Sequence, residues 1–116
     1  MCPAQHTYMD MAHTGDPDDW GASWAAFISL ADSITWSPIL GDTRLAPRVI
    51  GVQGVFWSEF TIVDYQIEPM IGPHILGVAQ QAWNPEHALD PETFVALVGT
   101  VAPLFDAIGW ARNPSA

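Results

Sequence analysis

The pattern of apolar residues predicts two short strands, and polar side chains follow the end of each. Residues 49–54 (Val-Ile-Gly-Val-Gln-Gly) begin with a β-branched run, the composition of a strand buried inside a sheet. Residues 6–10 (His-Thr-Tyr-Met-Asp) form a second expected strand near the start of the chain. In an extended segment, residues i and i+2 point to the same side, so Tyr8 and Asp10 should share one face.

Three longer segments predict amphipathic helices. The first covers residues 19–33, with Asp19 as its N-cap. The second covers residues 62–82 and is interrupted by Pro69 and Pro73, which lack a backbone N–H. The third covers residues 90–108 and begins at Asp90-Pro91, an N-cap followed by proline. The expected buried faces are Trp20, Trp24, Phe27, Ile28, Ala31 and Ile34 in the first helix, and Phe94, Leu97, Val98, Val101, Leu104, Phe105 and Ile108 in the third.

The order strand, helix, strand, helix, helix predicts two parallel strands that are neighbours or near neighbours in one sheet. Parallel strands are covered on both faces, and two strands cannot make a covered sheet alone. The chain therefore looks like a slice of a larger α/β sheet or barrel. In α/β barrels the carboxyl ends of the strands carry the active site, which is where the polar residues lie.

Trp57 and Glu59 follow the strand at residues 49–54 and are separated by one residue. If the strand geometry continues, both face the same way and could hold a sugar, the ring packing on C–H groups and the carboxylate accepting from hydroxyls. On spacing alone, a core tryptophan beside a solvated glutamate is the commoner arrangement. The six tryptophans in a chain of 116 residues favour a binding surface, although core packing can use two or three.

The charge balance excludes several classes of partner. Thirteen acidic residues against three arginines give a net charge of −10, which argues against nucleic acid or an anionic membrane. A single cysteine excludes an internal disulfide, and the four histidines lack ligand spacing, so neither a metal nor another cofactor is expected. No apolar run is long enough to span a membrane, and no signal peptide is visible, which makes the cytoplasm the default compartment.

These pieces together resemble glycoside hydrolase family 20, the β-N-acetylhexosaminidases. Residues 49–53 (VIGVQ) and 56–59 (FWSE) resemble the family segment "VLGVQ…LWTE", and residues 6–10 (HTYMD) resemble "HHTYLD". Residues 70–83 are similar to the helix "MLFPRLAALAEVAW", Ser23-Trp24 to a loop "SW", and residues 104–109 to "RLDALG". The resemblance extends over nearly the whole chain, in order, and favours the sugar-site interpretation of Trp57 and Glu59.

The resemblance implies that residues 1–116 are the C-terminal portion of a family 20 catalytic domain. They would be the last quarter of a (β/α)8 TIM barrel: strand 7, helix 7, strand 8, helix 8 and a terminal helix. The family removes terminal N-acetylglucosamine or N-acetylgalactosamine with retention, using the substrate's own acetamido oxygen as nucleophile. Tyr8 matches the hydroxyl that hydrogen-bonds that oxygen. Asp10, Trp24, Trp57 and Glu59 match residues that bind the sugar.

Some expected family features are missing from this sequence. The catalytic Asp-Glu pair belongs to strand 4, which the chain does not contain, so we expect the isolated chain to be inactive without the N-terminal part of the barrel. A non-catalytic remnant that binds sugar or another partner is the alternative. His74 and Gln80 stand where the family has Arg and Glu, so a neutral contact should replace an ion pair. We expect Trp20 and Trp36 to pack on a helix face and Trp83 in the core.

Overall fold

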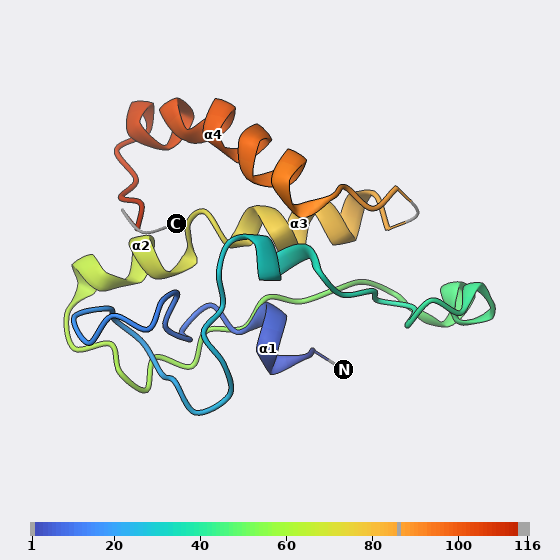
Figure 1. Cartoon of the computed structure of the whole chain (residues 1–116), viewed down its shortest axis with the longest axis horizontal. Coiled ribbons are helices and arrows are strands. Elements are labelled where there is room, and N and C mark those ends of the chain that lie inside the picture. The colour runs from blue at the N-terminus through green and yellow to red at the C-terminus, as the bar shows by residue number, and fades with distance from the viewer. Residues whose placement is uncertain (1, 86, 114–116) are drawn as a thin grey trace.

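The computed structural model describes residues 2–85 and 87–113. Figure 1 shows α4 lying above α3, with irregular N-terminal loops below them and an arm that projects to one side. We define the arm as residues 37–53. The helical elements, with η denoting a 3₁₀ helix, are α1 (Ala4–Thr7), η1 (Ala31–Ile34), η2 (Thr43–Arg48), η3 (Asp64–Gln66), α2 (Ile67–Ile71), α3 (Ile75–Trp83) and α4 (Pro91–Ala107).

The larger of two apolar clusters joins the C-terminal helices to the middle of the chain. The element η1 contacts α1, α3 and α4. Buried Leu30 and Ile34 pack with Phe94 and Val98 of α4, and Leu76 of α3 covers one side. A second cluster lies among the N-terminal loops and consists of Met11, Ala22 and Ile28. Because helices this short are not stable alone, tertiary contacts must stabilise these elements.

The third predicted helix is confirmed in α4. The Asp90 carboxylate accepts the backbone N–H of Thr93 at 2.9 Å, and proline occupies the first turn. The predicted buried face is only partly correct. Phe94, Val98 and Phe105 are buried, whereas Leu97, Leu104 and Ile108 are exposed, because α4 packs on α3 and η1 through one narrow stripe.

The two predicted strands are not present as strands among the described residues. Residues 4–7 form one turn of helix instead, and Tyr8 and Val55 make an isolated parallel bridge. Within the described part of the chain, residues 50–54 make no backbone hydrogen bond. A ladder needs a neighbour along its whole length, and this chain supplies one at a single position. The parallel contact is thus made by Val55, directly after the segment predicted as a strand, and not by residues 49–54 themselves.

The first predicted helix, residues 19–33, is wrong over most of its length. Gly21 has a φ of +105°, and the N–H groups of Ala22 and Ile28 donate to the carbonyls of Asp10 and Ala12. These bonds to another segment replace the bonds that a helix would make within itself. The expected N-cap, Asp19, instead accepts the N–H groups of His13 (2.9 Å) and Thr14 (2.7 Å). Only η1 remains helical.

The second predicted helix is divided into η3, α2 and α3. Pro69 lies near the start of α2, where its missing N–H has little effect. Gly72 and Pro73, in contrast, end the helix after Ile71. Ahead of these elements, the Gln66 side chain accepts the N–H of Ile62 at 2.8 Å. The helix therefore begins later than predicted and restarts at Ile75.

The tryptophans outside the candidate site differ in how far they are packed against the rest of the chain. Trp36 donates its indole N–H to the Ser33 carbonyl at 2.9 Å, and Trp20 packs edge-to-face on Tyr65. The expectation that Trp83 lies in the core is wrong, because its side chain is 89% exposed. It is the last residue of α3 and lines the groove between α3 and α4.

Two helical glycines give a matched test of the packing between α3 and η1. A Cβ on Gly77 would lie 2.0 Å from the Ser33 Oγ, so Gly77→Ala should lower the free energy of unfolding by about 1–3 kcal/mol. A Cβ on Gly99 meets nothing within 4 Å, so Gly99→Ala should raise it by about 0.5–1 kcal/mol. Urea unfolding measures both, and equal effects would contradict the close approach of Ser33.

Candidate functional site

The parallel bridge brings together the ends of the two segments predicted as strands. The Met9 N–H donates to the Val55 carbonyl at 2.8 Å, and the Val55 N–H donates to the Thr7 carbonyl at 2.9 Å. This pattern places Tyr8 directly opposite Val55. The residues that follow each bridge position therefore start from neighbouring points in space.

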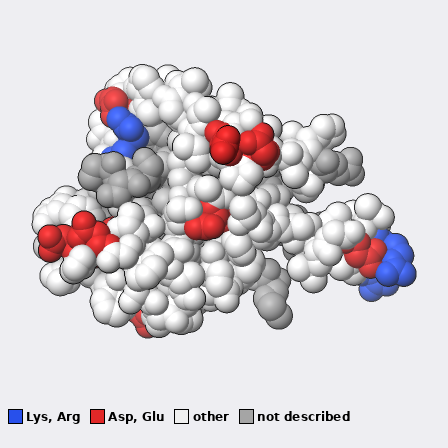
Figure 2. Space-filling model, in the orientation of Figure 1, with Lys and Arg blue, Asp and Glu red and all other residues white. Residues whose placement is uncertain are grey.

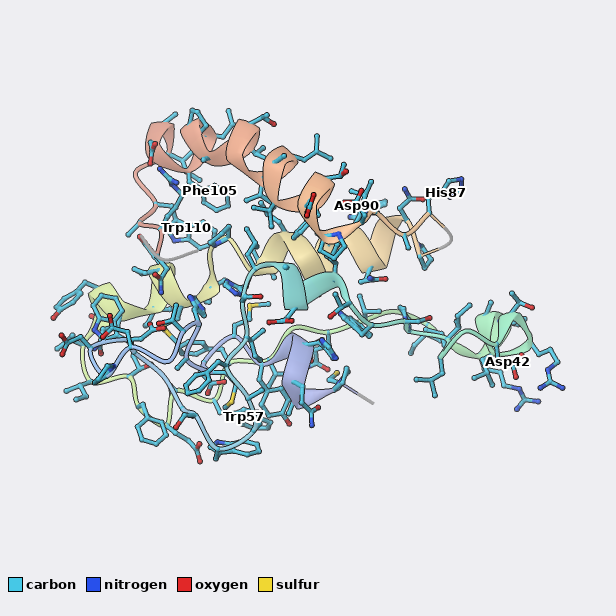
Figure 3. The ribbon with its side chains drawn as sticks, in the orientation of Figure 1. Asp42, Trp57, His87, Asp90, Phe105 and Trp110 are labelled. Atoms are coloured by element: carbon cyan, nitrogen blue, oxygen red, sulfur yellow. The ribbon has the colours of Figure 1, made fainter. Side chains whose placement is uncertain are left out.

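Three aromatic rings from three segments meet at this place. Tyr8 packs edge-to-face on Trp24, with centroids 6.2 Å apart, and is tilted against Trp57 at 6.3 Å. Tyr8 is half-buried, while the two indoles are 64% and 62% exposed. Trp57 lies on the side of the molecule away from α4 (Figure 3). The cluster therefore offers exposed ring surface beside one phenol hydroxyl.

Asp10 connects the two segments through its side chain. The residue is 3% exposed, and its Oδ2 accepts the backbone N–H of Trp57 at 2.8 Å. Its Oδ1 is buried and has no hydrogen-bond partner among the residues that the structure describes. A buried carboxylate oxygen is strongly disfavoured without a donor, so this oxygen is suited to accept a hydroxyl proton from a ligand.

Glu59 is exposed, and the extended geometry expected to place it on the same side as Trp57 is not formed. Ser58 has a φ of +58°, a left-handed conformation that ends the extended geometry between the two residues. Glu59 makes no hydrogen bond or ion pair with other described residues. Of the five predicted site residues, the structure brings together Tyr8, Asp10, Trp24 and Trp57, and it leaves Glu59 at the edge.

The basic side chains lie away from this cluster. Arg44 is paired with Asp42 at the tip of the arm, where Arg48 also lies, and Arg112 is paired with Asp106. Figure 2 shows these basic side chains at two separate places among dispersed acidic ones. The aromatic cluster therefore has no described cation nearby to attract a phosphate, which is consistent with a neutral ligand.

Metal and membrane features can be assessed for residues 2–85 and 87–113. In that part of the chain, no group of three or more His, Cys, Asp or Glu side chains could hold a metal ion. No helix there has both the length and the apolar character needed to cross a bilayer.

A buried histidine pair is the feature that the sequence did not reveal. The rings of His13 and His74 stack with centroids 3.9 Å apart and planes inclined by 21°. Burial, together with the neighbouring His74, lowers the pKa of His13 to about 4, and burial also lowers the pKa of His74. The expected His74–Gln80 contact is not formed, since His74 bonds to the Ile28 carbonyl and Gln80 to that of His87.

The family of this chain follows from its similarity to known proteins. Residues 1–86 match glycosyl hydrolase family 20, catalytic domain. The chain belongs to glycosyl hydrolase family 20. The match includes the whole aromatic cluster, Asp10 and the histidine pair, and it ends before α4.

Curated relatives within family 20 are several times longer than this chain. It is 31% identical, over 98% of its own length, to a β-N-acetylhexosaminidase of Cellulomonas fimi, of which it covers 23%. It is 26% identical, over 72% of its length, to a β-hexosaminidase of Vibrio vulnificus, of which it covers 12%. The chain therefore spans less than a quarter of either relative.

Solved family 20 structures share its fold. The β-N-acetylhexosaminidase from Streptomyces coelicolor A3(2) superimposes with a TM-score of 0.83 at 32% identity, over 97% of this chain and 23% of that one. An enzyme from Vibrio harveyi in complex with N-acetylglucosamine gives 0.82 at 26% identity, over 93% and 17%. These neighbours imply a TIM-barrel enzyme, of which this chain corresponds to a small part.

The Asp10 carboxylate should hold Trp57 in place. Asp10→Ala removes a charge-assisted bond to the Trp57 N–H and should lower the free energy of unfolding by about 1–3 kcal/mol. It should also shift the Trp57 indole resonance in NMR spectra. Asp16→Ala is the control, because the exposed Asp16 carboxylate accepts, among the described residues, only the neighbouring Asp18 N–H, and it should change stability by less than about 0.5 kcal/mol. An unchanged Trp57 resonance in Asp10→Ala would contradict the link.

Proposed function

We propose that residues 1–116 form the C-terminal portion of a family 20 catalytic domain and supply half of the subsite for a terminal N-acetylhexosamine. The family match, combined with the meeting of Tyr8, Asp10, Trp24 and Trp57 at one place, is the observation that carries this proposal. The chemistry of the cluster also suits a neutral sugar, since it combines exposed ring faces with a buried carboxylate oxygen.

The proposed place of each segment in the barrel follows from the order of the chain. Residues 6–10 correspond to strand 7, residues 19–33 to helix 7 and residues 49–54 to strand 8. The segments α2 and α3 correspond to helix 8, and α4 to the terminal helix. The direction of the single bridge between Tyr8 and Val55 supports adjacent parallel strands 7 and 8.

Tyr8 acts, in this proposal, on the reacting group of the substrate. Its hydroxyl donates to the acetamido oxygen as that oxygen attacks the anomeric carbon, so it holds the oxygen in position without competing as a base. Two indoles contact the Tyr8 ring and hold it in place. This positioning costs the transition state nothing, because the ring is already packed before substrate binds.

The other four residues bind the sugar. Trp57 lies under the pyranose ring, and Trp24 borders it from the facing loop. Asp10 accepts a hydrogen bond from a sugar hydroxyl through its Oδ1, while its Oδ2 accepts the Trp57 backbone N–H. Glu59 accepts from the 4- and 6-hydroxyls, and this role requires the exposed loop after Ser58 to place its carboxylate over the ring.

Hydrolysis itself requires residues from the rest of the barrel. By resemblance, the general acid/base Glu and the Asp that orients the acetamido group belong to strand 4, and no segment of this chain resembles that strand. The unpaired backbone of residues 50–54 supports this dependence on a larger unit. Residues 50–54 are extended and lack described backbone partners, and Ile50 is fully exposed.

A non-catalytic sugar-binding role is the second candidate, favoured by the exposed indoles of Trp24 and Trp57. Half a subsite encloses its ligand poorly, and we therefore expect weak binding at most. A folded chimera without activity, together with heat of binding when N-acetylglucosamine is added to residues 1–116, would favour this candidate.

A chimera tests the main proposal. Residues 1–116 replace the matching quarter of the Cellulomonas fimi relative, and release of a chromogenic aglycone from an N-acetylglucosaminide is measured. The chimera should be active and residues 1–116 alone inactive. Tyr8→Phe in the chimera should lower kcat by about 10²–10³-fold, as loss of a transition-state donor does.

Tyr65→Phe is the matched control for Tyr8→Phe, because Tyr65 is exposed and contacts Trp20 outside the cluster. It should leave kcat unchanged. Activity in residues 1–116 alone, or equal effects of the two tyrosine variants, would contradict the roles assigned.

Two exposed isoleucines test whether residues 49–54 become a buried strand. Ile50 and Ile62 are both exposed in this chain, so Ile50→Asp and Ile62→Asp should each change its stability by less than about 0.5 kcal/mol. In the chimera, Ile50→Asp should lower the free energy of unfolding by about 3 kcal/mol or more, because it buries an unpaired carboxylate. Ile62→Asp should not. Equal effects in the chimera would exclude the strand 8 assignment.

A further inference from the structure

The buried pair His13 and His74 lies where three parts of the chain meet. His13 belongs to the loop after Asp10, His74 precedes α3, and Asn113 from the C-terminal segment bonds to the Nδ1 of His13 at 2.8 Å. Both histidines are almost fully buried, and their rings stack at 3.9 Å. Nothing in the proposed reaction uses either residue.

The pair is connected to the loop that carries Trp24 through Ile28. The Nε2–H of His74 donates to the Ile28 carbonyl at 2.8 Å, since a carbonyl can only accept. The Ile28 N–H donates to the Ala12 carbonyl at 2.9 Å, and Ala12 precedes His13. Ile28 is thus held from both sides by the segments that bear the two histidines.

The loop is hydrogen-bonded only near its two ends. In the described part of the chain, residues 23–27 make no hydrogen bond, while Ala25 and Ala26 pack on the apolar cluster that contains Ile28. At one end Ala22 pairs with Asp10 and Ala12, and at the other Ile28 pairs with Ala12 and His74. The position of Trp24 against Tyr8 therefore depends on these two anchors and on the apolar packing between them.

The environment of the rings favours the neutral form of both. Burial is the main cause of the lowered pKa of each, and the Coulomb interaction with His74 lowers that of His13 further. Asp19, from the neighbouring loop, opposes the shift of both, and Asp32 of η1 opposes that of His74. Beside Asn113, Arg112 is already paired with Asp106 of α4.

Burial disfavours protonation of either ring in the folded chain. Among the described residues, His13 Nε2 and His74 Nδ1 are buried without a well-formed hydrogen bond to a side chain or backbone group. An added proton would place a positive charge in this buried site, beside a second imidazole at stacking distance, and the backbone groups of Met70 and Ser29 offset that cost only in part.

We propose that the neutral His13–His74 stack positions the loop that carries Trp24, and that protonation of the pair releases that loop. The folded pKa of His13 lies below its ordinary value of 6.5, so the stack contributes its full stability above that pH. That contribution is lost progressively as the pH falls from 6.5 toward about 4. The role of Trp24 in sugar binding rests on the proposed function, but the coupling between the pair and the loop does not.

An NMR titration without sugar tests this coupling directly. Residues 1–116 are titrated from about pH 7.5 to about pH 3, a range that spans both the ordinary pKa of histidine and the lowered pKa of His13. The indole N–H of Trp24, assigned with Trp24→Phe, and the Cε1–H of each histidine are followed. We expect the Trp24 resonance to shift with the midpoint of the buried pair. A Trp24 midpoint that differs from that of both histidines would overturn the proposal.

Variants separate positioning from simple packing. His74→Gln retains an N–H donor for the Ile28 carbonyl but cannot titrate, and the double variant with His13→Gln removes both titrating rings. The double variant should lose the pH response of Trp24 while keeping its resonance near the position found at neutral pH. His87→Gln, at an exposed residue outside the pair, should keep the full response.

The outcomes are independent of whether the chain binds sugar. A pH response that persists in the double variant would overturn the proposal, whatever the chimera shows. If the double variant does not fold, the coincidence of midpoints in the unmodified chain still decides the question. If the chimera is inactive but the Trp24 and histidine midpoints coincide, the proposed function is contradicted and the coupling between the histidine pair and the Trp24 loop is supported.

Discussion

The two hydrogen bonds between the Thr7–Met9 backbone and Val55 are the constraint on which the candidate site depends. They join segments 47 residues apart, and Asp10 adds a third link to Trp57 across the same separation. Closing a loop of that length costs about 3 kcal/mol beyond a fixed term. Two neutral hydrogen bonds return about 2 kcal/mol. The apolar clusters around Met11 and Phe94 must therefore hold the segments in place before the bridge can order the site.

Elements specified by neighbouring residues could be predicted from the sequence, whereas elements that depend on distant hydrogen-bond partners could not. Helix α4 was predictable because Asp90 and Pro91 specify its start locally, whatever surrounds it. The helix expected at residues 19–33 failed because Ala22 and Ile28 bond to residues 10 and 12, and spacing within the segment contains no record of those partners. The strands failed for a similar reason, since pairing along residues 50–54 needs a neighbour that this chain does not provide. Their composition predicts burial, but Ile50 is fully exposed in this chain.

The candidate site is predicted by family resemblance rather than by periodicity. Tyr8 and Asp10 are expected on one face of a strand; that strand is not formed, but both residues reach Trp57, one by its ring and one by its carboxylate. The extended geometry expected between Trp57 and Glu59 ends at Ser58, where the backbone is left-handed. The histidine pair had no sequence signal at all. Its members are distant in sequence and resemble no ligand motif, so only the folded chain brings them into contact.

The least supported parts of the chain are those that would touch a sugar. Trp24 lies in a loop whose described residues make no hydrogen bonds, and the indoles of Trp24 and Trp57 are mostly exposed. Exposed rings become useful binding surfaces only when their positions are fixed in advance, since ordering them on binding consumes affinity. The fixing comes from residues behind them: Tyr8 between the rings, Asp10 under the Trp57 backbone, and His74 at the end of the Trp24 loop. The first two would also contact the sugar, whereas His74 can change its protonation state without altering the binding surface itself.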